Sequence, residues 1–184
     1  MCDEHAVDAA GHYRQLLQLG REEFLTSAAP AALVRYRRED EDPSASAART
    51  LTLDDEIDVP PEYPTEETLP FSKSVSLAAD LEVFPLAKKP GASFPDRITI
   101  GRTSNNDVVI ADTSISRLHA YIRRDGATWF VADAGSKNGS WLKGGVLEPR
   151  KERGLPSRAL LRFGDVDLTF YDASDLYLAL GGAG

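Results

Sequence analysis

Side chains able to hold an anion gather in two short stretches of the sequence, residues 100–120 and 133–139. Both stretches join apolar runs typical of strands to loops rich in Gly, Asn and Ser, and loops held by a rigid sheet often carry binding residues. They supply guanidinium, ammonium, hydroxyl and amide groups with few carboxylates beside them. Such a set suits a compact anion with several acceptor oxygens, such as a phosphate ester. These candidate residues are Arg102, Ser116, Arg117, Lys137 and Asn138.

Arg102 stands where a predicted strand ends, directly after Gly101, a residue that lets the backbone turn. Its guanidinium can donate two parallel hydrogen bonds to a phosphate, and each charge-assisted bond contributes ~1.5–3 kcal/mol. The competing interpretation is a surface arginine paired with Asp107 or Asp112.

Asn138 precedes Gly139 in the second stretch. Its amide can hold a peptide backbone by donating and accepting at once, and the glycine gives a tight loop the freedom it needs. The competing interpretation is an Asn-Gly turn without a ligand. Ser116 taken alone would likewise be a loop cap.

Three pieces of these stretches together resemble the signature of forkhead-associated (FHA) domains, which bind phosphothreonine peptides. They are Gly-Arg at 101–102, Ser-Arg-x-His at 116–119 and Ser-x-Asn-Gly at 136–139, in the right order and with strands between them. The resemblance covers roughly residues 75–180 and says nothing about the first seventy residues.

The resemblance implies a role for each matching residue. It implies that Arg102 contacts the phosphate and that Ser116 and Arg117 complete its shell of donors. It also implies that Asn138 grips the peptide main chain while Lys137 lines the site. Structural roles fall to Gly101, His119 and Gly139, and the weaker candidates for peptide selectivity are Ser104, Asn105 and Asn106.

A hydrolase is one alternative, because Ser116, His119 and Asp112 lie close together in the sequence. The Gly-x-Ser-x-Gly turn of a strained nucleophile is absent, however, and no triad acid can be named. We therefore expect no catalytic residue. His5 and His12 stand seven residues apart without the cysteine or carboxylate pattern of a metal site, so we expect no metal and no cofactor.

The composition narrows the class of partner. The chain has 184 residues and a net charge of -8, with 7 Lys/Arg against 17 Asp/Glu in residues 1–80 and 14 against 12 in residues 81–184. Dense positive charge is what nucleic acid requires, so we expect no nucleic-acid partner. No apolar run reaches the ~20 residues of a membrane span. The start of the chain lacks the features of a secretory signal, and Cys2 is the only cysteine. We therefore expect a cytoplasmic protein without a membrane partner.

The N-terminal part has helical periodicity. Apolar residues recur at helical spacing from about Ala6 to Leu25, with interruptions at Gly11 and Gly20. We expect an amphipathic helix packed on the neighbouring domain, and a docking helix for a second protein is the alternative. Residues 33–36 fit either a short strand or a continued helix. Residues 39–70 are acidic and rich in proline, which is typical of a linker.

After residue 71 the hydrophobic period becomes two, and Asp125-Gly126 is a tight-hairpin signal. Ser174 is predicted to cap a short closing helix over 175–180 that ends at Gly181 and Gly182. Many short strands with regular turns predict an all-β sandwich, and the FHA resemblance implies a sandwich of about eleven strands. The predicted strands lie at 75–83, 98–100, 108–110, 118–122, 129–131, 141–142, 160–163 and 166–170.

We predict a helical segment over residues 1–38, an acidic linker over 39–70 and an FHA-type antiparallel β-sandwich with a short C-terminal helix over 71–180. The predicted function is a non-catalytic phosphothreonine-binding adaptor in Ser/Thr kinase signalling, with a kinase or its substrate as the partner. A scaffold that does not depend on phosphate is the alternative. A phosphorylated Thr52, with Asp55 three residues on, would be a tethered ligand for the domain's own site.

Overall fold

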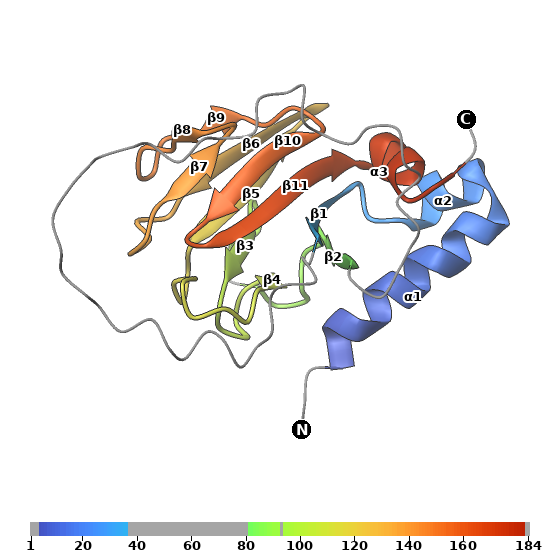
Figure 1. The fold of residues 1–184 in the computed structure, drawn as a ribbon, viewed down its shortest axis with the longest axis horizontal. Coiled ribbons are helices and arrows are strands. Elements are labelled where there is room, and N and C mark those ends of the chain that lie inside the picture. Colours follow the sequence, from blue (N-terminus) through green and yellow to red (C-terminus); the bar gives the residue numbers. More distant parts are fainter. Residues whose placement is uncertain (1–3, 37–80, 93, 183–184) are drawn as a thin grey trace, which may run out of the picture.

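The structure is a computed structural model that describes residues 4–36, 81–92 and 94–182. Two β-sheets face each other, and three helices lie together at one end (Figure 1). In order, the six-stranded sheet contains β2 (Leu81–Pro85), β1 (Ala31–Tyr36), β11 (Val166–Asp172), β10 (Ala159–Phe163), β7 (Ser140–Leu142) and β8 (Gly145–Val146). The five-stranded sheet contains β4 (Val108–Val109), β3 (Ile98–Gly101), β5 (Ala120–Asp125), β6 (Thr128–Asp133) and β9 (Arg153–Gly154).

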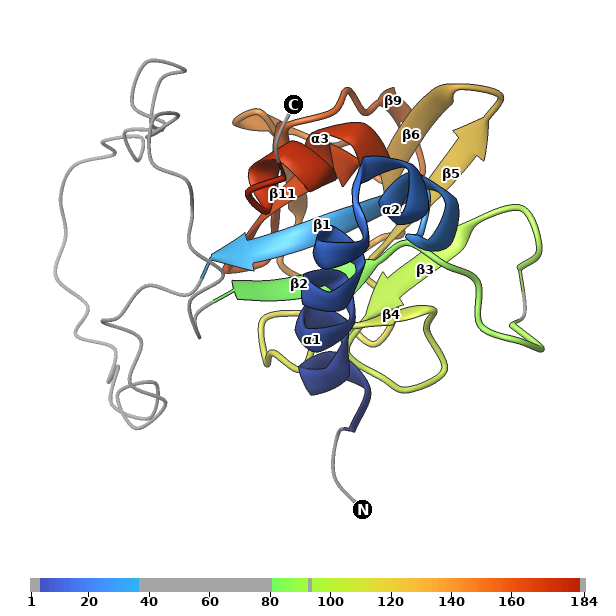
Figure 2. The same cartoon turned by 90° about the vertical axis from the view of Figure 1, so that its right-hand side faces the viewer.

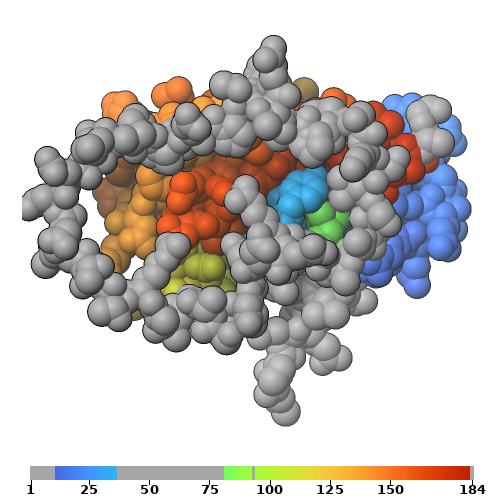
Figure 3. Space-filling view, viewed as in Figure 1, coloured from blue at the N-terminus to red at the C-terminus, as the bar shows by residue number. Residues whose placement is uncertain are grey.

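The predicted β-sandwich is confirmed. Side chains from the inner faces of both sheets form one hydrophobic core, and alternation along β10 shows the expected period of two. Trp129 of β6 packs edge-on against Phe170 of β11, with 5.6 Å between ring centroids, and so joins the two sheets. All strand pairs are antiparallel except β3 with β4, which the predicted antiparallel arrangement did not include. In Figure 3 the orange and red residues towards the C-terminus face the viewer at the left and centre, and the blue residues of the N-terminal segment lie at the right.

The N-terminal segment contains two helices, α1 (Glu4–Leu19) and α2 (Arg21–Ser27). Gly20 separates them with a φ of 99°, whereas Gly11 lies within α1 and does not interrupt it. Tyr13 and Phe24 are buried against the outer face of the six-stranded sheet and α3 (Ala173–Ala179), in a second hydrophobic cluster. Figure 2 shows α1 crossing in front of β2. The predicted packing of an amphipathic helix on the sandwich is confirmed.

Residues 31–36, for which the sequence allowed a strand or a helix, form β1. This strand pairs with β11 on one side and with β2 on the other. The sandwich therefore includes a strand from the N-terminal segment that the sequence assigned to a separate unit. Tyr36 is the register partner of Leu81, so residues 37–80 connect two neighbouring antiparallel strands. The predicted linker, Thr52 and most of the predicted strand over 75–83 lie outside the described residues.

The sequence predicted a hairpin turn and a helix cap, and the structure agrees with the first prediction only. The hairpin at Asp125-Gly126 is confirmed, because Asp125 and Thr128 are register partners and Gly126 has a φ of 58°. The predicted cap of the closing helix is wrong. Asp172 is the N-cap of α3 and accepts a hydrogen bond from the Asp175 backbone N–H at 2.8 Å, whereas Ser174 lies inside the first turn.

Candidate functional site

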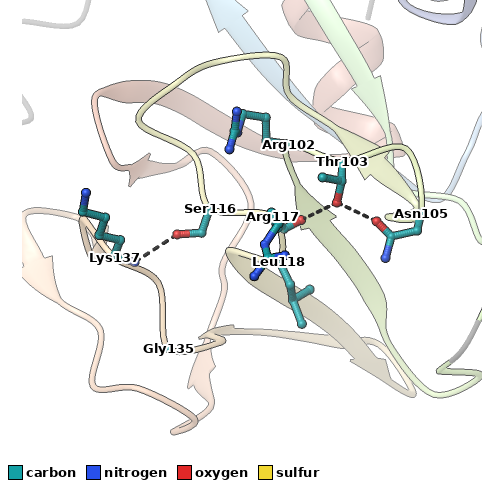
Figure 4. Close-up of a pocket in the computed structure, with 8 residues that line it drawn as sticks. All are labelled: Arg102, Thr103, Asn105, Ser116, Arg117, Leu118, Gly135 and Lys137. Atoms are coloured by element: carbon teal, nitrogen blue, oxygen red, sulfur yellow. Dashed lines mark hydrogen bonds between the residues drawn. The ribbon is translucent and has the colours of Figure 1, made fainter.

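Three loops meet beside β3 and form an open hollow of about 830 Å³. They connect β3 to β4, β4 to β5 and β6 to β7, so the two motif stretches of the sequence are brought together. Figure 4 shows the eight residues that line the hollow. They are Arg102, Thr103, Asn105, Ser116, Arg117, Leu118, Gly135 and Lys137.

Close backbone approach joins the first two loops. The Arg102 backbone N–H donates to the Ser116 carbonyl at 3.0 Å, and Asn106 donates through Nδ2 to the Arg117 carbonyl at 2.6 Å. A Cβ on Gly101 would stand 2.3 Å from that same Arg117 carbonyl oxygen. Glycine is required here because only a residue without a side chain allows this approach.

His119 joins the second loop to the third. Its ring is fully buried, and Nδ1 accepts a hydrogen bond from the Ser116 backbone N–H at 3.0 Å. The ring proton therefore lies on Nε2, which donates to the Gly139 carbonyl at 3.0 Å. Burial lowers the pKa of His119 below its usual value, although the Gly139 carbonyl and Asp133 oppose that shift. His119 is thus a neutral residue that positions the loops.

Asp133, at the end of β6, organises the third loop. Its Oδ1 accepts from the backbone N–H groups of Gly135 and Ser136 at 2.7 and 2.9 Å, and its Oδ2 accepts from the hydroxyls of Ser136 and Ser140 at 2.6 and 2.5 Å. Burial acts to raise the pKa of Asp133, but these hydrogen bonds outweigh it and hold the pKa below the usual value. The loop is therefore built around a buried carboxylate that is ionised at neutral pH.

The three cationic side chains of the hollow have no ion-pair partner among the described residues. Arg102, Arg117 and Lys137 are all exposed, and no carboxylate lines the hollow with them. The competing partners predicted for Arg102 are engaged elsewhere. Asp107 binds Lys88 at 2.8 Å, and Asp112 accepts from the backbone and hydroxyl of Ser114. The guanidinium of Arg102 is left to face solvent in the hollow.

Ser116 is placed to donate a hydrogen bond. Its Oγ accepts from the Lys137 backbone N–H at 2.9 Å, and no acceptor for its own proton lies among the described residues. The hydroxyl can therefore donate to an anion beside Arg102 and Lys137. The Ser-His contact of a hydrolase is missing, because His119 bonds the backbone N–H of Ser116 and the Gly139 carbonyl instead of the serine hydroxyl.

Asn138 lies at the edge of this group and does not line the hollow. Its Nδ2 donates to the Ser114 carbonyl at 2.8 Å, which leaves Oδ1 able to accept a hydrogen bond from a peptide N–H. Gly139 takes a φ of 83°, which suits glycine.

The three predicted selectivity residues lie at different positions relative to the hollow. Asn105 lines the hollow, and Ser104 is exposed outside it. Asn106 is buried outside the lining of the hollow, and its Nδ2 donates to the carbonyls of Thr103 and Arg117. The sequence reasoning missed Thr103, Leu118 and Gly135, whose only signal was their position beside the motifs.

The sequence pattern of the FHA domain matches residues 98–164. That segment carries all three motif pieces and the loops that form the hollow. This chain therefore contains an FHA domain, which the match places at residues 98–164.

Relatives share only part of their length with this chain. An "FHA domain-containing protein" of Arabidopsis thaliana is 32% identical over 78 residues, which cover 42% of this chain and 19% of the relative. An "oxoglutarate dehydrogenase inhibitor" of Corynebacterium diphtheriae is 34% identical over 74 residues, which cover 40% of this chain and 50% of the relative. The chain thus spans half or less of the length of these relatives.

Solved structures give partial likenesses. The N-terminal FHA domain of S. cerevisiae Rad53p, in complex with a phosphothreonine peptide, aligns with a TM-score of 0.43 at 20% identity over 53% of this chain and 90% of that one. Mycobacterium tuberculosis EmbR, in complex with a low-affinity phosphopeptide, aligns with a TM-score of 0.39 at 28% identity over 42% of this chain and 20% of that one. The family assignment rests on the match at residues 98–164, not on these alignments.

Two further findings concern the described residues alone. No helix there has the length and apolar character needed to cross a membrane. Within the same ranges, no three His, Cys, Asp or Glu side chains are grouped so that they could hold a metal ion.

Proposed function

We propose that this chain is a non-catalytic adaptor that binds phosphothreonine peptides in Ser/Thr kinase signalling. The observation that carries the proposal is a hollow in which Arg102, Arg117 and Lys137 have no carboxylate partner among the described residues. Unpaired cations that converge with a free hydroxyl donor favour a dianionic ligand, and phosphate offers several acceptor oxygens for them.

Each residue has a part in this proposal. Arg102 donates a charge-assisted pair of hydrogen bonds to the phosphate, and Ser116 adds its hydroxyl proton. Lys137 and Arg117 contribute positive charge from the two sides of Ser116. Asn138 accepts from a peptide N–H through Oδ1, since its Nδ2 is engaged by the Ser114 carbonyl.

Preorganisation supports the proposal as well. The backbones of the three loops are joined by His119, Asn106 and the Ser116–Lys137 contact before any ligand arrives. A site whose donors are already fixed loses little conformational entropy on binding, which favours affinity.

A peptide array tests the proposal. It should display matched peptides that carry phosphothreonine, phosphoserine, phosphotyrosine or unmodified threonine. We expect binding to the phosphothreonine series above the other three. Equal binding to modified and unmodified peptides would instead favour the scaffold that does not depend on phosphate.

The partner we propose is a phosphothreonine-containing protein, either a Ser/Thr kinase or its substrate, in the cytoplasm. Thr52 remains a predicted tethered ligand. Phosphorylation of the protein, followed by mapping of the site and titration with an outside phosphopeptide, tests it. Unchanged binding after modification at Thr52 would contradict it.

A further inference from the structure

Leu118 is the only aliphatic side chain among the eight described residues that line the hollow, and it is 40% exposed. A single exposed leucine is ordinary on a protein surface and by itself indicates nothing. Leu118, however, directly follows Arg117 and faces the same hollow as the three unpaired cations. Its position therefore makes it part of the surface that a bound peptide would cover.

The backbone on both sides of Leu118 is fixed. The carbonyl of Arg117 accepts from Asn106 Nδ2 at 2.6 Å, and its oxygen lies 2.9 Å from the Thr103 hydroxyl oxygen. The backbone N–H of His119 donates to the Ile100 carbonyl at 2.8 Å. Leu118 is thus held by buried neighbours, and its exposure is not a consequence of a loosely attached loop.

The hollow has two chemically different sides. Figure 4 shows Ser116 and Lys137 on one side and Leu118, Thr103 and Asn105 on the other. Asn105 accepts from the Thr103 hydroxyl through Oδ1 at 2.5 Å, so its Nδ2 protons remain to donate to a ligand. The side near Leu118 therefore offers an apolar surface beside one amide donor.

We propose that Leu118 forms a second subsite, which selects an apolar side chain close to the phosphothreonine of the bound peptide. This inference rests on the proposed function. The phosphate occupies the side of Arg102, Ser116 and Lys137, and a neighbouring residue of the peptide covers Leu118. A carboxylate placed on Leu118 would be partly removed from water without a cation committed to it, since the phosphate takes the cations of the hollow.

The size of the preference follows from the exposed share of Leu118. Covering the remaining 40% of a leucine side chain corresponds to about threefold to eightfold in affinity. That effect is small beside the contribution of the phosphate, so it sets selectivity among phosphothreonine peptides.

A degenerate peptide library with fixed phosphothreonine and every flanking position varied tests the subsite. It should be read with the wild-type chain, Leu118→Gln, Leu118→Met and the matched control Leu178→Gln. Leu178 is 44% exposed and lies on α3, at the helical end of the molecule. We expect the wild type to enrich aliphatic side chains at one flanking position, with Leu118→Met and Leu178→Gln giving the same profile. We expect Leu118→Gln to lose that enrichment while it still requires phosphothreonine.

Other outcomes overturn the inference. An acidic preference, no preference at any flanking position, or a preference that survives Leu118→Gln would each exclude a Leu118 subsite while leaving phosphothreonine binding intact. Failure of the wild type to require phosphothreonine would overturn the proposed function and the subsite together.

Discussion

Asp133→Asn is expected to destabilise the protein by about 2–4 kcal/mol. The four hydrogen bonds to the Asp133 carboxylate come from two backbone N–H groups and two serine hydroxyls. Hydrogen bonds to a charged group contribute ~1.5–3 kcal/mol each and neutral ones ~0.5–1.5 kcal/mol. The asparagine oxygen can keep the two backbone bonds in weaker form. Its NH₂ group stands in place of the oxygen that accepts from Ser136 and Ser140, so those two hydrogen bonds are lost. The variant no longer buries a charge, and this lower desolvation cost offsets part of the lost free energy.

Urea unfolding measures this difference, with Asp167→Asn as the matched control. The Asp167 carboxylate is 75% exposed and lies 4.0 Å from Arg162, so its replacement should change the free energy of unfolding by less than ~0.5 kcal/mol. The pH dependence carries a second signature. Because the pKa of Asp133 is lowered in the folded state, its contribution is present above the unfolded pKa of about 3.9 and is lost as pH falls through the folded pKa. Asp133→Asn should remove that part of the acid sensitivity. A loss of stability no larger than that of Asp167→Asn would refute the argument that this carboxylate organises the loop.

Two further predictions concern His119 and the helix cap. Burial lowers the pKa of His119 in the folded protein. As pH falls below about 6.5, the imidazole is therefore protonated first in the unfolded chain. The stability that neutral His119 contributes above that pH is lost as pH falls towards the folded pKa. Unfolding curves for the wild type and His119→Gln across that range should converge towards low pH, and parallel curves would contradict the assignment. Asp172→Ala should lower the free energy of unfolding by ~0.5–2 kcal/mol, because it removes the N-cap of α3. Ser174→Ala should change that free energy by less than ~0.5 kcal/mol in the same urea titration. A larger destabilisation by Ser174→Ala than by Asp172→Ala would indicate that Ser174 is the cap, as the sequence predicted.

Contiguous features were the predictable ones. The loops at 101–102, 116–119 and 136–139 carry their chemistry in adjacent residues, so the sequence could group them as one candidate site, and the structure brings the three loops together at one hollow. The alternation of β10 and the Asp125-Gly126 turn are likewise local, and both appear in the structure as expected.

Features that depend on distant partners were not predictable. Residues 31–36 are a strand because β11 pairs with them from more than a hundred residues away. A short apolar run beside a helix does not reveal that partner. Asn106 is buried because Gly101 lets the Arg117 carbonyl approach. The choice of Asp172 over Ser174 as the cap depends on where β11 ends, and both residue types are good caps.

Arg102 is the residue that we propose to hold the phosphate of a phosphothreonine ligand. The most direct test titrates the tightest phosphothreonine peptide from the array, and its unphosphorylated form, against the wild type, Arg102→Ala and Arg21→Ala. Arg21 is an exposed arginine at the start of α2, so its replacement makes the same change in charge at the helical end.

We expect Arg102→Ala to lose two charge-assisted hydrogen bonds, roughly 3 kcal/mol or more, and therefore over a hundredfold in affinity, with little change in thermal stability. Arg21→Ala should bind within about twofold of the wild type, because a distant exposed charge is screened. Equal affinity of the wild type and Arg102→Ala for the phosphorylated peptide, or equal affinity of the wild type for both forms of the peptide, would contradict the claim.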